Sequence, residues 1–417
     1  MIIWKMMNDW LWKNFRKTYL QRKDIPEIMF KRFLALTLSS MLILSSISGC
    51  GKKEVEEEVT TEDYSINLTE TATLNDSSDI DMSKDGKVLS DLNGSWIDKD
   101  LAKQRYMAVM VNNIIDAMPQ SGVEAADVVY EMLEEGGITR LMAIYQPDFT
   151  GVEKVGPIRS ARHYYDRKAL EYDAVFVHWG QSIYAEHEFE TLKPLDQVDL
   201  NGKDGEYGFR SDDREAPHNA YSSGKNILEA IKSDSFRTEK DEKYVKMFNF
   251  NSDDTELEGG KDAKKITTSY NEGRQPWFEY DSEAKVYKRF QYGEPQIDAE
   301  TGNQLTYKNV IIQFAPHKQI TNDSVGCIDI TFSGKGEGFY ATDGKIIPIK
   351  WSKKGKKKFI DYSITDGLLD DTTRKGNPSS YGVTEFTTAD GQPLKLNPGK
   401  TWVTVFPDDN TKGIVVE

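Results

Sequence analysis

Apolar runs of strand length alternate with polar turns from about residue 100 onwards. Residues 106–111 form one such run, which ends at Asn112-Asn113, and residues 174–177 form another. A continuous apolar run of this length is typical of a strand that is buried on both faces. Residues 119–122 have the composition of a turn, which a short alanine-containing helix is expected to follow, and residues 223–231 predict a longer helix.

Two further runs, residues 127–134 and 138–145, flank Gly136-Gly137 and predict a hairpin with a tight turn. The expected pairs across it are Glu135 with Ile138, Leu133 with Arg140, and Glu131 with Met142. In this register Arg140 lies diagonal to Glu131 and Glu135 on one face of the sheet. Such a cluster is either a site for acid–base chemistry or a set of ion pairs at the sheet surface. A helix over residues 123–135 is the alternative to the hairpin.

From residue 307 onwards, short apolar strands alternate with glycine turns. The expected strands are residues 310–314, 325–332, 338–341, 346–349, 402–406 and 413–416. We therefore predict an α+β fold, in which an N-terminal α/β domain with a mixed sheet precedes a C-terminal β-rich domain. The expected boundaries are 99–235 for the first domain, 236–300 for a polar connecting segment and 301–417 for the second domain.

The start of the chain has the pattern of a secretory leader, predicted for residues 1–49. Lys31 and Arg32 precede an apolar run at residues 33–47, which is shorter than the roughly 20 residues of a membrane span. Translation from Met29 would give a signal peptide of ordinary length at residues 29–49. A start at Met1 is the alternative, and it would add residues 1–28.

The residues Ile47-Ser48-Gly49-Cys50 close this leader. An aliphatic residue, a small residue, glycine and cysteine resemble the lipobox of bacterial lipoproteins. The resemblance implies a lipid on the Cys50 thiol, which would anchor the folded part at the extracytoplasmic face of the cell membrane. A plain signal anchor with an incidental cysteine is the alternative. Residues 50–98 form an acidic segment whose composition is typical of a disordered tether.

Charge and cysteine content narrow the classes of partner. The formal net charge of −15 argues against nucleic acid as a partner. The chain has two cysteines, so acylation of Cys50 would leave no intrachain disulfide. Cys327 lies in an apolar run, where a buried, unreactive thiol is expected.

Cationic residues gather where a helix is expected to begin. Ser160 suits an N-cap for a helix that runs to Leu170. The cations Arg159, Arg162, His163 and Arg167 would then lie at the positive end of the helix dipole, where added cations are unfavourable. Either a bound anion or an internal carboxylate from Glu131, Glu135 or Glu171 would compensate.

Two histidines complete the candidate residues. His178 follows the strand at residues 174–177, at the strand end where ligands usually bind in α/β sheets. His218 and Asn219 lie in a polar loop at residues 209–221. The spacing of His178 and His187 matches no metal motif, so neither a metal ion nor another cofactor is predicted.

Four short strings in the chain are uncommon in sequence and occur in a fixed order. They are Pro119-Gln120-Ser121-Gly122, Glu135-Gly136-Gly137-Ile138-Thr139-Arg140, Gly156-Pro157-Ile158-Arg159-Ser160-Ala161-Arg162 and Ala216-Pro217-His218-Asn219. In this order they resemble the YerB-like lipoproteins, from about residue 100 to the C-terminus. The resemblance implies a two-domain lipoprotein, typically of Gram-positive bacteria, and no established activity. The basic segment at residues 352–382 departs from the family pattern, and its role stays open.

Three functions remain open at this point. The protein could bind an anionic envelope ligand, either a wall polymer or a small anion. The binding residues would be Arg140, Arg159, Arg162, His163, His218 and Asn219. It could instead be an envelope hydrolase or transferase, with Glu131, Glu135, His178 or His218 as acid or base. As a third alternative, it could be a docking module for another envelope protein, whose identity the sequence does not indicate.

Overall fold

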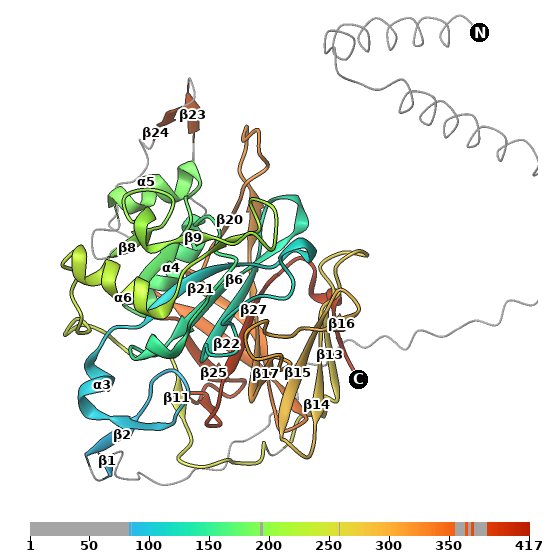
Figure 1. The fold of residues 1–417 in the computed structure, drawn as a ribbon. Coiled ribbons are helices and arrows are strands. Elements are labelled where there is room, and N and C mark those ends of the chain that lie inside the picture. Colours follow the sequence, from blue (N-terminus) through green and yellow to red (C-terminus); the bar gives the residue numbers. More distant parts are fainter. Residues whose placement is uncertain are drawn as a thin grey trace, which may run out of the picture. The chain divides into compact units, whose positions relative to one another are not determined.

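The structure, a computed structural model, describes residues 83–84, 86–191, 195–257, 259–354, 363–365, 368–370 and 382–417. The predicted leader, Cys50 and most of the tether lie outside these residues, as does most of the basic segment 352–382. The described part of the chain is mostly strand, with few helices (Figure 1). The narrower prediction, an α/β character for the N-terminal half, stays a prediction.

A mixed sheet of 11 strands forms the main body of the fold. Its order is β12 (Lys261–Asp262), β22 (Lys345–Lys353), β21 (Gly334–Thr342), β18 (Asn309–Ala315), β27 (Thr401–Pro407), β5 (Val128–Leu133), β6 (Thr139–Tyr145), β4 (Met107–Asn112), β7 (Val175–His178) and β8 (Gln197–Asp199), with β25 (Glu385–Thr388) beside β22. Strand β27 pairs in parallel with both β18 and β5. One continuous sheet therefore contains strands from both halves of the chain.

Both faces of this sheet are buried, which explains its continuous apolar runs. In β4, Met107, Val109 and Val111 belong to one hydrophobic cluster, whereas Ala108 and Met110 belong to the cluster on the opposite face. Successive side chains of a strand point to opposite faces, so a strand covered on both sides is apolar throughout. The strand predicted at residues 106–111 is confirmed.

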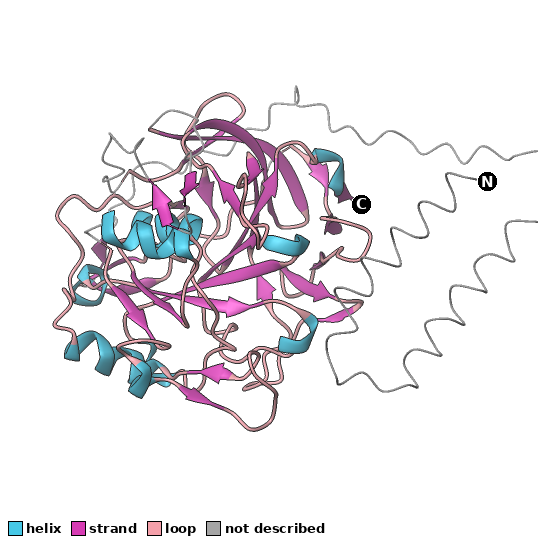
Figure 2. Cartoon of the chain, turned by 90° about the horizontal axis from the view of Figure 1, so that it is seen from above, coloured by secondary structure: helices cyan, strands magenta, loops and turns pink. Residues whose placement is uncertain are grey.

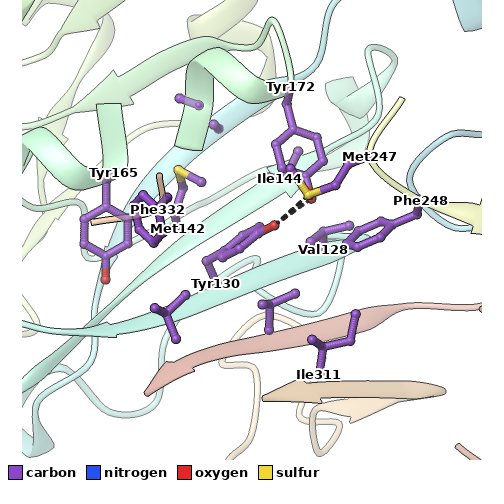
Figure 3. Packing of buried hydrophobic residues seen from close by; sticks show 14 of the residues in the cluster. Val128, Tyr130, Met142, Ile144, Tyr165, Tyr172, Met247, Phe248, Ile311 and Phe332 are labelled. Atoms are coloured by element: carbon purple, nitrogen blue, oxygen red, sulfur yellow. Dashed lines mark hydrogen bonds between the residues drawn. The ribbon is translucent and has the colours of Figure 1, made fainter. Parts of the chain in front are cut away.

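Aromatic side chains close one face of the sheet (Figure 3). The hydroxyl of Tyr130, on β5, lies 3.0 Å from that of Tyr172 and 3.1 Å from the sulfur of Met247. The ring of Phe248 packs edge-on against Tyr172 at 6.4 Å between centroids. Residues 247–250 thus pack beside β5, which lies more than 100 residues earlier in the chain.

A second sheet of six strands covers part of the opposite face. It contains β16 (Glu294–Pro295), β15 (Val286–Gln291), β14 (Trp277–Asp281), β13 (Lys265–Thr268), β28 (Ile414–Val416) and β17 (Thr306–Tyr307). Ile266, Phe278 and Tyr287 pack in the same cluster as Trp402 of the large sheet. Four of these strands lie within residues 236–300, predicted as a connecting segment. Their outward positions are polar, which lowers the hydropathy of the segment.

The helices lie beside these strands, which fill the middle of the fold (Figure 2). They are α3 (Lys99–Lys103), α4 (His163–Glu171), α5 (Ile183–Thr191) and α6 (Gly224–Ser233), with 3-10 turns η1 (Ile115–Ala117), η2 (Glu135–Gly137), η3 (Phe149–Gly151), η4 (Gly205–Tyr207) and η5 (Thr411–Gly413). The predicted helix at residues 223–231 is confirmed as α6, whose cap Ser223 accepts a hydrogen bond from Asn226 N at 3.1 Å. The prediction of a short helix after residue 122 is wrong, because residues 123–127 are irregular, with a turn at residues 124–125. Within the described ranges, no helix is long and apolar enough to span a bilayer.

The remaining strands form small ladders. These are β1 (Ser83–Lys84), β2 (Lys87–Leu89) and β3 (Trp96–Asp98); β9 (Phe209–Arg210) with β10 (Ala220–Tyr221); β11 (Asn249–Phe250) with β26 (Lys395–Leu396); β19 (His317–Gln319) with β20 (Ile328–Ile330); and β23 (Ser363–Thr365) with β24 (Leu368–Asp370).

A buried ion pair connects the two sheets. Glu131 Oε2, on β5, lies 2.8 Å from Arg289 Nη2, on β15, and both side chains are fully buried. The guanidinium of Arg289 lies 4.6 Å from the ring centroid of Phe278 and 4.5 Å from that of Trp402. Thr139 Oγ1 donates a second hydrogen bond to Glu131, at 3.0 Å. The carboxylate predicted as a candidate acid or base is thus bonded inside the core.

Replacing Arg289 with alanine should destabilise the whole fold. The substitution leaves Glu131 buried without its cation, which typically costs about 3–5 kcal/mol of unfolding free energy. Lys288→Ala, at the neighbouring and partly exposed position, should cost less than about 1 kcal/mol. Urea unfolding followed by circular dichroism measures both. Equal losses for the two variants would show that the ion pair does not hold the sheets together.

Candidate functional site

The hairpin of β5 and β6 is confirmed, but its predicted register is wrong. The observed partners are Leu133 with Thr139, Met132 with Arg140 and Glu131 with Leu141. The connection is longer than a two-residue turn: Glu134 N donates to Ile138 O at 2.7 Å, and η2 occupies the bend. A shift of one residue moves a side chain to the other face of the strand. Arg140 therefore lies on the opposite face from Glu131.

This register brings Glu134 to Arg140, a partner that the sequence pattern did not indicate. Glu134 Oε2 lies 2.6 Å from Arg140 Nη2, and both residues are buried. Desolvation dominates the titration of this carboxyl and raises its pKa, whereas the Arg140 and Arg162 guanidinium groups act against that shift. The adjacent Glu135 binds Arg162, whose Nε lies 3.0 Å from Oε1 and 3.2 Å from Oε2. Arg140 and Arg162 are thus neutralised by the protein itself.

Helix α4 begins later than predicted, at His163, with Arg162 at the N-cap position. Ser160 makes no cap there; its hydroxyl donates to Trp179 O at 3.2 Å. The chain is still extended at this point, because Ile158 bridges to Val111 and Ala161 bridges to Gln181. These bridges place Arg159 outside the helix.

The structure separates His163 from the other candidate binding residues. His163 is fully buried, and its Nε2 lies 2.9 Å from Asp329 Oδ1. Arg167 Nη1 contacts the same carboxylate oxygen at 3.0 Å, and Arg167 Nη2 lies 2.6 Å from Glu188 Oε1. Both side chains therefore belong to a second cluster of polar and charged groups, around Asp329 and Glu188.

Among the three arginines at residues 140, 159 and 162, Arg159 is the one without a carboxylate partner in the described part of the chain. Its side chain is half-buried, and its Nε is buried without a hydrogen-bond partner in the described part of the chain. Burial, and then the nearby Arg140 guanidinium, lower the pKa of Arg159 to about 10, while Glu134 acts in the opposite direction. Arg140, Arg159 and Arg162 thus share two carboxylates, Glu134 and Glu135, which leaves one positive charge in excess.

A loop from residues 209–221 borders Arg159. Arg210 lowers the pKa of Arg159 through charge repulsion. Its own guanidinium lies 4.9 Å from the ring centroid of Trp179, and its Nη1 donates to Asn219 Oδ1 at 2.8 Å. Asn219 in turn donates to Ser211 O at 2.9 Å, so Asn219 holds the loop and orients Arg210.

His218 lies close enough to Arg159 for the two side chains to interact electrostatically. Burial, and then the charge of Arg159, lower its pKa, while Asp116 acts in the opposite direction. Its Nδ1 lies 2.9 Å from Asn112 Nδ2. An amide nitrogen can only donate, so Nδ1 accepts and Nε2 carries the proton of the neutral ring. His218 thus offers one N–H donor beside the unpaired arginine.

The four strings that carry the family resemblance, called the family strings below, meet around Arg159. Ser121 and Gly156 exchange two backbone hydrogen bonds, at 2.8 and 3.1 Å, and Ile158 N donates to Ala220 O at 2.6 Å. Arg214 donates to the carbonyl oxygens of Ala117 and Pro119. Cis peptide bonds precede Pro119, Pro157 and Pro217. Residues 119–122, residues 156–162 and the loop at residues 209–221 therefore form a backbone scaffold, and residues 135–140 add Glu135 and Arg140 to its charged groups.

His178 and Cys327 make the contacts of buried, structural residues. His178 is fully buried, with Nδ1 at 2.9 Å from Gly180 O and Nε2 at 2.6 Å from Gln197 Oε1. Burial lowers its pKa. Cys327 is 6% exposed, and desolvation raises the pKa of its thiol to about 12, which agrees with the expected unreactive cysteine. The described residues include no group of three or more metal-ligand side chains.

The buried His178 should make stability depend on pH. Its lowered pKa means that the unfolded chain binds a proton below pH about 6.5, which the folded chain resists. Stability therefore falls as the pH drops below this value, and His178→Asn should reduce the difference in unfolding free energy between pH 7 and pH 5. Denaturant unfolding at both pH values measures it. An unchanged difference would mean that His178 is protonated as easily in the folded protein as in the unfolded chain.

Comparisons with known proteins agree with the family resemblance that the four family strings carry. Residues 92–237 match the N-terminal domain, and residues 266–369 the C-terminal domain, of a protein family of unknown function, DUF3048. A Bacillus subtilis (strain 168) protein named "Putative lipoprotein YerB" is 30% identical over 332 residues, which is 77% of this chain and 87% of that protein. The crystal structure of Bacillus subtilis YerB superposes with a TM-score of 0.65 at 28% identity, covering 79% of this chain and all of the other. The chain therefore belongs to the YerB-like (DUF3048) family of two-domain proteins.

Proposed function

We propose that this protein is a lipid-anchored, extracytoplasmic binding protein that holds the carboxylate or phosphate group of an envelope ligand at Arg159. The observation that carries the proposal is the charge count at the family strings. Two of the three arginines there have a carboxylate partner, and Arg159 has none among the described residues. Arg210 and the N–H of His218 would complete the set of donors.

The energetics of Arg159 favour an anionic ligand. A half-buried guanidinium beside other arginines is unfavourable, as the lowering of its pKa to about 10 indicates. A bound carboxylate or phosphate would accept hydrogen bonds from its donors and offset the repulsion from Arg140 and Arg210. Such charge-assisted hydrogen bonds typically contribute about 1.5–3 kcal/mol each.

Catalysis receives less support from the same geometry. Glu131 is bonded to Arg289 in the core, and Glu135 is bonded to Arg162. His178 is enclosed by Gly180 and Gln197. Of the four candidate acids and bases, only His218 borders Arg159, which suits a donor to a bound anion.

Two observations support the proposed lipid anchor: the leader pattern of this chain and the name of the Bacillus subtilis relative. The Bacillus subtilis relative carries the word lipoprotein in its name, and Cys50 of this chain follows a lipobox-like sequence. We therefore place a diacylglycerol on the Cys50 thiol and the folded part outside the cytoplasm.

Arg159→Ala should weaken anion binding. Titration calorimetry with inorganic phosphate would use residues 50–417 carrying Cys50→Ser, which retain every described residue. Loss of the unpaired guanidinium should raise the Kd about 10- to 100-fold, as expected for the loss of one charge-assisted contact. The melting temperature should stay nearly the same, because the Arg159 side chain makes no internal bond among the described residues.

The matched control is Arg237→Ala. Arg237 already binds Asp173, which keeps Arg105 as a second partner, so phosphate affinity should not change. Equal affinities of the Arg159 and Arg237 variants, or no phosphate binding by the parent chain, would refute the proposed anion site.

Cys50→Ser should release the protein from the membrane. Without the thiol there is no site for the diacylglycerol, so labelling with radioactive palmitate should disappear and the chain should leave the membrane fraction. Cys327→Ser serves as the control, because Cys327 is buried and should carry no lipid. Palmitate retained on Cys50→Ser, or lost from Cys327→Ser, would contradict the assignment.

A further inference from the structure

A cavity of about 250 Å³ lies at the N-terminal edge of the described fold, and no residue of the four family strings lines it. Its walls come from β2, the residues after it, α3 and the segment that leads into β11. The lining residues are Val88, Leu89, Ser90, Asp91, Ala102, Lys246, Phe248 and Phe250. Most of these side chains are apolar, so the cavity suits a ligand with an apolar body.

One wall is formed by alternate residues of the segment that ends in β11. Lys246, Phe248 and Phe250 are two residues apart, and all three line the cavity. Phe248 is fixed from behind, because its ring stacks on Phe386 at 6.1 Å between centroids; it also packs on Tyr172 (Figure 3). The aromatic wall therefore exists before a ligand arrives.

Lys240 bonds to two of the remaining lining residues, Asp91 and Ala102. Its Nζ lies 3.1 Å from Asp91 Oδ2, 2.8 Å from Ala102 O and 2.6 Å from the hydroxyl of Tyr106. Ser90 is also engaged, since its hydroxyl accepts a hydrogen bond from Gln146 Nε2 at 2.7 Å. The polar groups on this side of the cavity thus have internal partners.

The charges at the cavity leave one cation without a partner. The carboxylate of Asp91 is neutralised by Lys240. Lys246 is exposed and has no ion pair among the described residues. A ligand head group at Lys246 should therefore be negative.

We infer that this cavity binds an unbranched alkyl chain with an anionic head group, its tail between Phe248, Phe250 and the β2 wall and its head at Lys246. The volume of the cavity limits the length of the alkyl chain. A cavity of about 150 Å³ holds benzene, so about 250 Å³ accommodates roughly six to ten non-hydrogen atoms. Two sources supply this chemistry, a free alkanoic acid and the acyl chain of an anionic lipid. The inference is independent of the anion site at Arg159.

The test measures the affinity of residues 50–417 carrying Cys50→Ser and Arg159→Ala, which removes the proposed anion site, for sodium alkanoates of increasing length, from butanoate to dodecanoate, by titration calorimetry below their critical micelle concentrations. Each added methylene that enters the cavity should increase the affinity about fourfold. The increase should stop once the cavity is full. No saturable binding, or an increase that continues without a plateau, would overturn the inference.

Two variants localise the binding. Ala102→Leu fills the cavity with a residue that the α3 helix accepts, and it should reduce octanoate affinity at least tenfold. Val245→Leu makes the same kind of change at an exposed neighbour that does not line the cavity, and it should leave the affinity unchanged. Equal effects of the two variants would place the binding elsewhere and overturn the inference.

The head group is tested at Lys246. The chain carrying Cys50→Ser and Arg159→Ala should bind octanoate more tightly than 1-octanol, and adding Lys246→Gln should remove this preference while leaving 1-octanol binding unchanged. A preference that persists in the variant would overturn the role of Lys246. Competition by lysophosphatidylglycerol would assign the cavity to a lipid acyl chain, whereas octanoate binding without such competition would assign it to a free acid.

Discussion

The register of the β5–β6 hairpin decides which carboxylate meets which arginine, and the rest of the site depends on it. Leu133 opposite Thr139 places Glu131 on the face toward β15 and leaves Glu134 beside Arg140. Because side chains alternate along a strand, a shift by one residue would exchange these faces. Glu131 would then lose Arg289, and Arg140 would lose Glu134. The pairing of charges around Arg159 therefore depends on the observed register.

The same hairpin joins the two halves of the family fold. Strand β27, near the C-terminus, pairs with β5 and places Trp402 beside Arg289, close to the buried carboxylate of Glu131. The N-terminal part therefore completes its sheet with a C-terminal strand. This arrangement fixes β5 on both edges, since β6 occupies the other one, and it gives the charged residues near Arg159 a rigid support.

Much of the strand pattern followed from local sequence, whereas side-chain partners did not. The apolar runs that became β4, β18 and β27 were recognised because both faces of the sheet are buried. Strands β13 to β16 were missed because their polar outward residues mask the alternation. The α4 cap was misplaced at Ser160 because backbone bridges to Val111 and Gln181, distant in sequence, keep that segment extended. Glu134, Trp179 and Arg210 join the site only through tertiary packing, so no spacing in the sequence marks them.

The most direct test of the account is the response of individual arginine side chains to an anion. In ¹⁵N NMR spectra of the Nε–H groups, added phosphate should shift the Arg159 signal saturably, because this group has no internal acceptor among the described residues. The signal of Arg162 should stay in place, since its Nε already donates to Glu135. A fixed Arg159 signal, or parallel unsaturable shifts of both, would contradict the proposal that the excess positive charge at the family strings awaits an anionic ligand.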